Sequence, residues 1–219
     1  MELDNREKVR NLLRFGKDTY YYLQILQRKK ENPELALSEI KRWRLFITSP
    51  SVLDRADSYI EFLCKNLNAR AYISVVPRNL EKYCKETAKE YINHLCIDEY
   101  SQVFRIGDRV ALSDKTVKWR GVIPCSRTLL DFDTKSLEKD DARRFLEEEG
   151  KIKVEEIIPT KNGFHVICEN HNTKTKFPEA ETRSNGDVAV YSEILGECVT
   201  YTMIREANTI YYASWKEDA

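Results

Sequence analysis

Apolar and polar residues follow one another along this chain in a pattern that predicts many short strands and a few amphipathic helices. Strands are predicted where β-branched and aromatic residues cluster or take every second position, because successive side chains of a strand point to opposite faces. These segments are residues 19–28, 42–49, 69–77, 128–133, 151–160, 163–169, 187–194, 198–204 and 208–215. Helices are predicted where apolar residues recur every three or four positions. They are residues 4–15, 35–41, 51–67, 80–95 and 136–149.

The order of these elements predicts an α+β fold with two lobes. The first half alternates strands and helices, and the second half runs strand, helix, strand, strand, followed by further strands. Such an order is typical of a mixed or mostly antiparallel sheet backed by helices. The polar stretch 97–120 separates the halves. We therefore expect an N-terminal α/β lobe in residues 1–110 and a second lobe in residues 111–219, joined as one compact unit.

Composition limits the classes of protein that fit this pattern. The chain has 219 residues, of which 42% are hydrophobic, enough for one sizeable core. Lys and Arg number 36 and so do Asp and Glu, which gives a formal net charge of zero. The whole-chain basic balance of many nucleic-acid binders is therefore absent, although a neutral sum is compatible with one locally basic face.

The sequence shows no sign of a membrane or secretory segment. No apolar run approaches the roughly 18 residues that span a bilayer. The N-terminal stretch MELDNREKVRNLL lacks the apolar region of a signal peptide. The six cysteines are scattered, without the close pairs of a zinc site, and are interpreted as reduced thiols. We expect a cytoplasmic protein with no membrane partner.

The segment LLDFD places Asp131 and Asp133 on the same face of a strand, with Leu130 and Phe132 on the other. Two neighbouring carboxylates repel one another, so a buried pair needs a cation between them. Mg²⁺ or Mn²⁺ suits such oxygen ligands and keeps positions open for phosphates. Two interpretations stay open. The pair binds a divalent metal in a cleft, or it ends the strand in solvent, with Asp133 capping the turn.

The segment PTKNGFHVI contains a tight turn that leads into a strand carrying His165. Asn162 and Gly163 are strong turn formers, and backbone N–H groups beside Lys161 can hold an anion. His165 shares its strand face with Gly163, where a ligand can approach closely. The alternative is a structural histidine with one hydrogen bond inside the sheet.

Taken together, these two motifs resemble the catalytic core of archaeo-eukaryotic primases and primase–polymerases. In that family, a strand with two acids one residue apart precedes a small-residue turn that leads to a histidine on a neighbouring strand. A third acid follows on a later strand. The resemblance covers residues 127–167 and implies a primase-like fold with an RRM-like catalytic lobe.

The resemblance also implies roles for individual residues. Asp131 and Asp133 would bind Mg²⁺ or Mn²⁺, and His165 would contact the triphosphate of an incoming nucleoside triphosphate. The turn around that triphosphate would be shaped by Thr160, Lys161 and Gly163. By its order along the chain, Asp187 is the candidate third catalytic acid, and Glu193 and Glu197 are the alternatives.

Two further segments carry residues suited to nucleic acid. Arg70 and Tyr72 alternate on one face of a strand, and Arg78 follows its end, so the three could contact a single-stranded DNA or RNA template. An amphipathic edge strand is the other interpretation. The stretch KRWRLF at residues 41–46 mixes basic and aromatic residues, a combination that suits the stacking of single-stranded nucleic acid. Surface arginines around a buried tryptophan would give the same pattern.

Three functions are compatible with these observations. The first is a metal-dependent nucleotidyltransferase of the primase–polymerase type. The second is an inactive protein of the same fold that binds nucleotide, nucleic acid or a protein partner. The third is a metal-dependent phosphoesterase that uses the same carboxylates.

Overall fold

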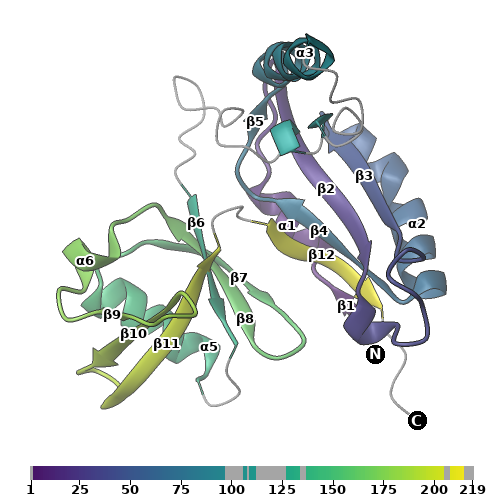
Figure 1. The fold of residues 1–219 in the computed structure, drawn as a ribbon. Coiled ribbons are helices and arrows are strands. Elements are labelled where there is room, and N and C mark those ends of the chain that lie inside the picture. The colour runs from purple at the N-terminus through teal and green to yellow at the C-terminus, as the bar shows by residue number, and fades with distance from the viewer. Residues whose placement is uncertain are drawn as a thin grey trace.

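Two antiparallel sheets backed by helices make up the part of the chain that the computed structural model describes, residues 2–96, 106–107, 109–111, 127–133, 137–204 and 208–214 (Figure 1). The first sheet has the order β1-β12-β4-β2-β3, with β5 also paired to β2. The second has the order β7-β8-β6-β11-β10-β9. This confirms the predicted α+β fold with two lobes.

The first sheet combines the N-terminal strands with the last strand of the chain. Its members are β1 (Glu2–Asp4), β2 (Thr19–Gln27), β3 (Arg42–Ile47), β4 (Ala69–Ser74), β5 (Arg78–Asn79) and β12 (Asn208–Ser214). Strand β12 lies between β1 and β4, and its Tyr211 and Tyr212 are fully buried in the first core. Residues 208–214 thus belong to the first sheet, whereas the sequence pattern assigned them to the second lobe.

Helices cover both faces of this sheet. Among the helices of this lobe are α1 (Arg6–Leu12), α2 (Pro50–Leu67), α3 (Leu80–Cys96) and the 3₁₀ turn η1 (Lys29–Glu31). Helix α2 packs on one face, and its N-terminus is capped by Ser49, whose side chain accepts a hydrogen bond from the Val52 N–H. On the other face, Tyr83 of α3 contacts the rings of Tyr20 and Phe46. This contact covers only the end of the face near the start of β2.

Two predicted helices differ from the structure. The segment predicted as one helix at residues 4–15 starts as strand β1, because Glu2, Leu3 and Asp4 pair with β12, and only then becomes α1. Residues 35–41 form turns and no helix. There the Ala36 N–H is bound by the Glu39 carboxylate in a local turn.

The second sheet has one face covered by the helical segments of its own lobe. Its strands are β6 (Arg127–Phe132), β7 (Val154–Pro159), β8 (Phe164–Glu169), β9 (Glu181–Thr182), β10 (Asp187–Ser192) and β11 (Glu197–Ile204). The helical segments are α5 (Lys139–Arg144), the π-helical turn η3 (Phe145–Glu149) and α6 (Thr173–Lys176). Leu130, Phe132 and Val166 point to the core under α5 and η3. The intervening residues of β6 and β8 therefore point to the other face, toward the first sheet.

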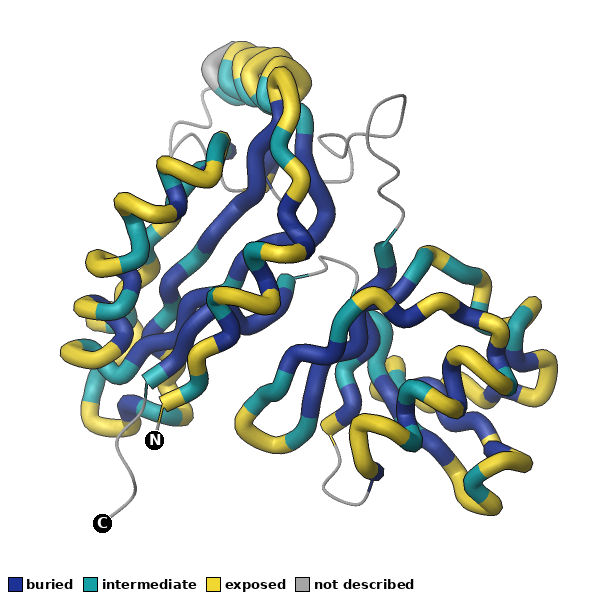
Figure 2. The backbone as a smooth tube through the Cα atoms, turned by 180° about the vertical axis from the view of Figure 1, so that it is seen from behind, coloured by how far each residue is buried: buried dark blue, intermediate teal, exposed yellow. Residues whose placement is uncertain are grey.

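A shared core and buried hydrogen bonds join the two sheets. Leu129, Ile158 and Ile167 of the second sheet pack in the same apolar cluster as the first sheet and α2. The Asn5 side chain donates to the carbonyls of Pro159 and Ile210, each at 3.1 Å. Figure 2 shows buried backbone in strands of both sheets. The junction thus fixes how the two sheets face one another.

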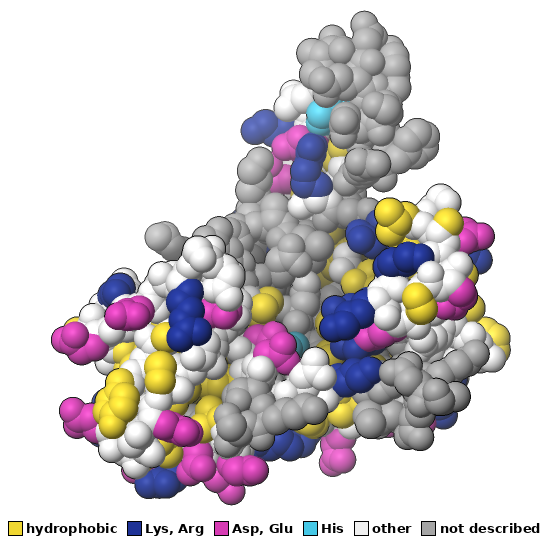
Figure 3. All heavy atoms as spheres, turned by 60° about the horizontal axis from the view of Figure 1, so that its bottom comes forward, with side chains coloured by type: hydrophobic (Ala, Val, Ile, Leu, Met, Phe, Trp, Pro, Cys, Tyr) yellow, Lys and Arg dark blue, Asp and Glu magenta, His cyan; other side chains and the backbone are white. Residues whose placement is uncertain are grey.

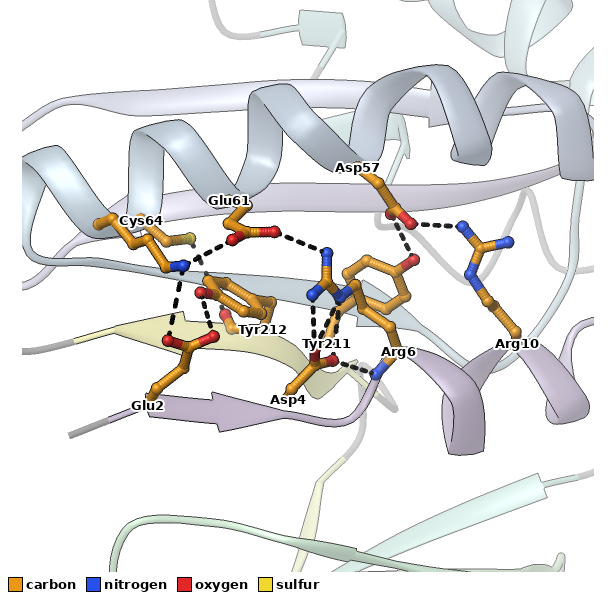
Figure 4. A network of polar contacts seen from close by, with 10 residues as sticks. Glu2, Asp4, Arg6, Arg10, Asp57, Glu61, Cys64, Tyr211 and Tyr212 are labelled. Atoms are coloured by element: carbon orange, nitrogen blue, oxygen red, sulfur yellow. Dashed lines mark hydrogen bonds and ion pairs between the residues drawn. The ribbon is translucent and has the colours of Figure 1, made fainter.

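A polar network anchors β12 to the rest of the first lobe (Figure 4). The Tyr211 hydroxyl donates to Asp57 of α2 at 2.7 Å, and the Tyr212 hydroxyl donates to Glu2 of β1 at 2.7 Å. The Arg6 guanidinium lies 4.9 Å from the centre of the Tyr212 ring. These contacts hold the strand whose first residues reach the site described below. In the part of the chain that is described, no helix is long and apolar enough to cross a membrane.

Candidate active site

A cleft of about 1160 Å³ lies between the two sheets. One wall comes from β2, β4, β12 and the loop after β2; the other comes from β6, β8 and the β7–β8 turn. Of the residues predicted from sequence, those that line it are Asp131, Asp133, Thr160, Lys161, His165, Arg70 and Tyr72. In Figure 3, acidic side chains and a histidine lie on one side of the hollow, with Lys and Arg side chains across from them.

The strand register places four polar side chains in one row across the second sheet. Asp187 pairs with Thr202, Thr202 with Asp131, and Asp131 with His165. Cross-strand partners in antiparallel pairs project from the same face of the sheet. This row lies on the face opposite the α5 core, so Asp131 and His165 point into the cleft.

Asp131 is held in an unfavourable environment for its charge. Burial, followed by the neighbouring carboxylates of Asp133 and Asp187, raises the pKa of its carboxyl to about 6. Asp133 follows the last residue of β6, is exposed and lines the same cleft. Burial and the two neighbouring carboxylates therefore together disfavour the ionised form of Asp131.

His165 is buried and makes contacts to both sheets. Its Nε2 lies 3.5 Å from Oδ1 of Asp131, and its Nδ1 lies 3.0 Å from Oγ1 of Thr209. Burial lowers the pKa of the imidazole to about 4, so the ring is neutral at pH 7. Thr209 was not predicted from the sequence, because it is 44 positions away and reaches His165 only through the return of β12.

Asp187 is the member of the row that is held as a charged carboxylate. Its Oδ1 accepts a 2.5 Å hydrogen bond from Thr202, and its Oδ2 accepts one of 2.6 Å from Asn185; both lower its pKa. One strand separates it from Asp131, so their Cα atoms are about 10 Å apart. It does not line the cleft itself.

The other two candidates for the third acid are farther away. Glu197 starts β11, five residues before Thr202, and Glu193 follows the end of β10. At about 3.4 Å per residue, Glu197 is some 17 Å along the strand from the row. The register therefore selects Asp187 as the acid nearest to Asp131.

The β7–β8 turn is closed by its own residues. The Thr160 N–H donates to the Gly163 carbonyl at 2.9 Å, and the Gly163 N–H donates to Thr160 Oγ1 at 3.2 Å. Neither Asn162 nor Gly163 has a positive φ. The turn thus depends on the threonine hydroxyl rather than on left-handed backbone, and it brings Lys161 to the cleft, while Gly163 does not line it.

On the opposite wall, Arg70 is paired with an acid that the sequence did not reveal. Its guanidinium binds both carboxylate oxygens of Glu31, and both side chains are less than one tenth exposed. Tyr72 lies in the same strand and lines the cleft. Arg78 is elsewhere: it is buried and pairs with Tyr20, at the end of β2 opposite to the cleft residues 24–27.

The donor set around Asp131 suits a hard divalent cation. A cation between Asp131 and Asp133 would relieve the repulsion that raises the Asp131 pKa. Among the described residues, no three or more His, Cys, Asp or Glu side chains converge as a complete metal site. Mg²⁺ is usually bound by one or two carboxylates, with water and phosphate oxygens as its other ligands. The pair Asp131 and Asp133 matches this pattern.

No family model, curated protein or solved structure matches this chain. Function is therefore inferred from the site itself. It combines two cleft carboxylates, a third carboxylate in the same row and a neutral imidazole, with arginine and lysine residues around the cleft. This combination is suited to binding a polyphosphate together with a divalent cation.

Proposed function

We propose that this protein is a metal-dependent nucleotidyltransferase of the primase–polymerase type. It would transfer a nucleotidyl group from a nucleoside triphosphate to the 3′ end of a nucleic acid paired with a single-stranded template. The observation that supports this most is the row Asp187–Thr202–Asp131–His165, of which Asp131 and His165 line a cleft between the two sheets together with Asp133. Along the chain, Asp131 and Asp133, then His165, then Asp187 follow the order that the primase resemblance implies.

In this proposal, Asp131 and Asp133 hold Mg²⁺ or Mn²⁺. When bound, the metal neutralises phosphate charge and favours the deprotonated 3′ hydroxyl. That hydroxyl oxygen attacks the α-phosphorus, the bond to the β-phosphate oxygen breaks, and pyrophosphate leaves. Asp187 stays ionised through its bonds from Thr202 and Asn185 and adds negative potential beside Asp131.

His165 has the role of a neutral donor to the triphosphate. In this proposal the Thr209 hydroxyl donates to Nδ1, which leaves the ring proton on Nε2, the nitrogen 3.5 Å from Asp131 Oδ1. A neutral imidazole binds a phosphate oxygen without adding a fixed charge. Lys161, on the adjacent turn, supplies the positive charge at the same end of the cleft.

A second candidate is a protein of this fold that binds nucleotide or nucleic acid without catalysis. It is favoured by the position of Asp187, whose two oxygens are both engaged and which does not line the cleft. Such a protein would bind its ligand equally well with and without divalent metal.

Incubation of the protein with a primed template, labelled nucleotides and Mg²⁺ or Mn²⁺ tests the proposal. We expect labelled extension products with the wild type and none with Asp131→Ala. Binding that resists EDTA, without any product, would favour the second candidate. Cleavage of the nucleic acid without nucleotide addition would indicate the phosphoesterase.

A further inference from the structure

The exposed part of the first sheet carries a basic strip that leads into the cleft. Strand register places Arg44 opposite Gln24, Gln24 opposite Tyr72, and Tyr72 opposite Ile210. These four residues form a row across β3, β2, β4 and β12. Arg42, Leu26 and Arg70 form the next row on the same face.

The inner members of both rows line the cleft, and the outer members are exposed arginines. Gln24, Leu26, Tyr72 and Ile210 belong to the cleft wall, whereas Arg42 and Arg44 are exposed on β3, at the sheet edge. Three strand spacings, about 14 Å, separate β3 from β12. The strip therefore runs outward from the site of Asp131 and His165.

The sign of the charge on this strip favours a polyanion. Residues 28–44 contain six Lys and Arg and three Glu, in a chain whose formal net charge is zero. One of those glutamates, Glu31, is already bound to Arg70. Arg28 and Lys30 line the cleft on the same wall. The local excess of positive charge thus extends from the sheet edge to the cleft.

The two arginines of β3 share their face with Phe46, which packs against Tyr20 and Tyr22 of β2. Trp43 and Leu45 pack against the core on the α2 face, and Arg42 and Arg44 project to the opposite face. Tyr72 is the partly exposed aromatic residue beside Gln24 on that face. Arginines that follow a strand, with an aromatic ring at the cleft, match the way proteins bind single-stranded nucleic acid without sequence preference.

We infer that this strip binds the phosphate backbone of single-stranded nucleic acid through Arg42 and Arg44, with a base stacked on Tyr72 at the entrance to the cleft. The inference deepens the proposed function and rests on it for the identity of the strand as the template. The binding itself does not require catalysis. A charged edge strand can also serve only to prevent pairing with another sheet, and the experiment separates the two roles.

Binding of fluorescent single-stranded DNA and RNA oligonucleotides, measured by anisotropy in EDTA without nucleotide, tests the inference. Each phosphate contact contributes about 0.7 to the slope of log affinity against log salt, so loss of two contacts weakens binding roughly 25-fold at 0.1 M salt. We expect this loss, and a slope smaller by about 1.4, for Arg42→Ala/Arg44→Ala. Arg42→Lys/Arg44→Lys should keep most of the affinity.

Arg55→Ala/Arg144→Ala is the matched control, because it removes two exposed arginines from α2 and α5. Its affinity should stay within about twofold of the wild type. Equal affinity of Arg42→Ala/Arg44→Ala and wild type would overturn the inference, as would absence of single-strand binding by the wild type. If Arg42→Ala/Arg44→Ala aggregates but binds single strands as tightly as the wild type, the two arginines serve only to keep the sheet edge from pairing with another sheet. Asp131→Ala should bind single-stranded oligonucleotides normally in this assay. Failure of the proposed catalysis can therefore be distinguished from failure of the proposed single-strand binding.

Discussion

Thr209 and His165 come from different sheets, and Oγ1 of the threonine lies 3.0 Å from Nδ1 of the histidine. Both residues are buried. The contact is possible only because β12 returns to the first sheet and places its first residues against β8. It fixes the orientation of the imidazole whose other nitrogen faces Asp131.

Thr209→Val should leave Nδ1 of His165 buried without a partner. We expect the free energy of unfolding to fall by about 1–3 kcal/mol, the usual cost of an unsatisfied buried polar group. Thr209→Ser keeps the hydroxyl, so its free energy of unfolding should fall by less than that of Thr209→Val. Urea denaturation measures both, and ¹⁵N shifts of the His165 ring should change in the valine variant alone. An unchanged ring spectrum in Thr209→Val would show that the threonine does not position the histidine.

The raised pKa of Asp131 makes stability depend on pH. The folded-state pKa of about 6 exceeds the ordinary value of 3.8, so the folded protein holds a proton more tightly than the unfolded chain. Stability contributed by this group is therefore present below about pH 4 and is lost as the pH rises to 6. His165, with its lowered pKa, makes stability rise with pH instead. The contribution of Asp131 is therefore measured as the difference in stability between the wild type and a variant of Asp131.

Asp131→Asn should be more stable than the wild type at pH 7 by about 1 kcal/mol, a value reduced for the partial exposure of the carboxyl. At pH 4 the difference should disappear. Thermal melts in EDTA at both pH values measure it. Addition of Mn²⁺ at pH 7 should raise the melting temperature of the wild type and leave that of Asp131→Asn unchanged. A wild type that is insensitive to Mn²⁺ would argue against metal binding by the acidic pair.

Removal of Glu31 from its buried pair with Arg70 should destabilise the first lobe strongly. Glu31→Gln removes the charge that compensates a buried guanidinium, which costs about 3–5 kcal/mol when a buried pair is broken. Glu34→Gln, on the same loop but exposed, should change stability by less than about 0.5 kcal/mol. Chemical denaturation of the two variants compares them directly. Equal stabilities would mean that solvent already screens the Arg70 charge.

The strand and helix pattern could be predicted closely from the sequence, because it depends on local periodicity. Residues 163–169, for example, were predicted as a strand, and β8 is Phe164–Glu169 with Phe164, Val166 and Cys168 on its core face. The same alternation predicted that Asp131 and Asp133 share a face, and both line the cleft.

What could not be predicted depends on contacts between distant segments. The return of β12 to the first sheet, the Thr209–His165 contact and the pairing of Arg70 with Glu31 all join residues that no local pattern relates. The choice among three candidate acids also needed the register of β10 with β11 and of β11 with β6. Arg78 was predicted near the site because it follows β4 in the sequence. The pairing that buries it at the far end of β2 could not be predicted from that position.

Template-directed incorporation of a single nucleotide shows whether this protein is a nucleotidyltransferase. A primed template offers one unpaired base, and each of the four nucleotides is supplied separately with Mn²⁺. We expect the wild type and Arg55→Ala/Arg144→Ala to add the complementary nucleotide only. The rate should fall at least about a hundredfold in Asp131→Asn, because a key electrostatic group is removed. The proposed nucleotidyl transfer is wrong if folded wild-type protein adds no nucleotide with either Mg²⁺ or Mn²⁺, or if Asp131→Asn is as active as the wild type.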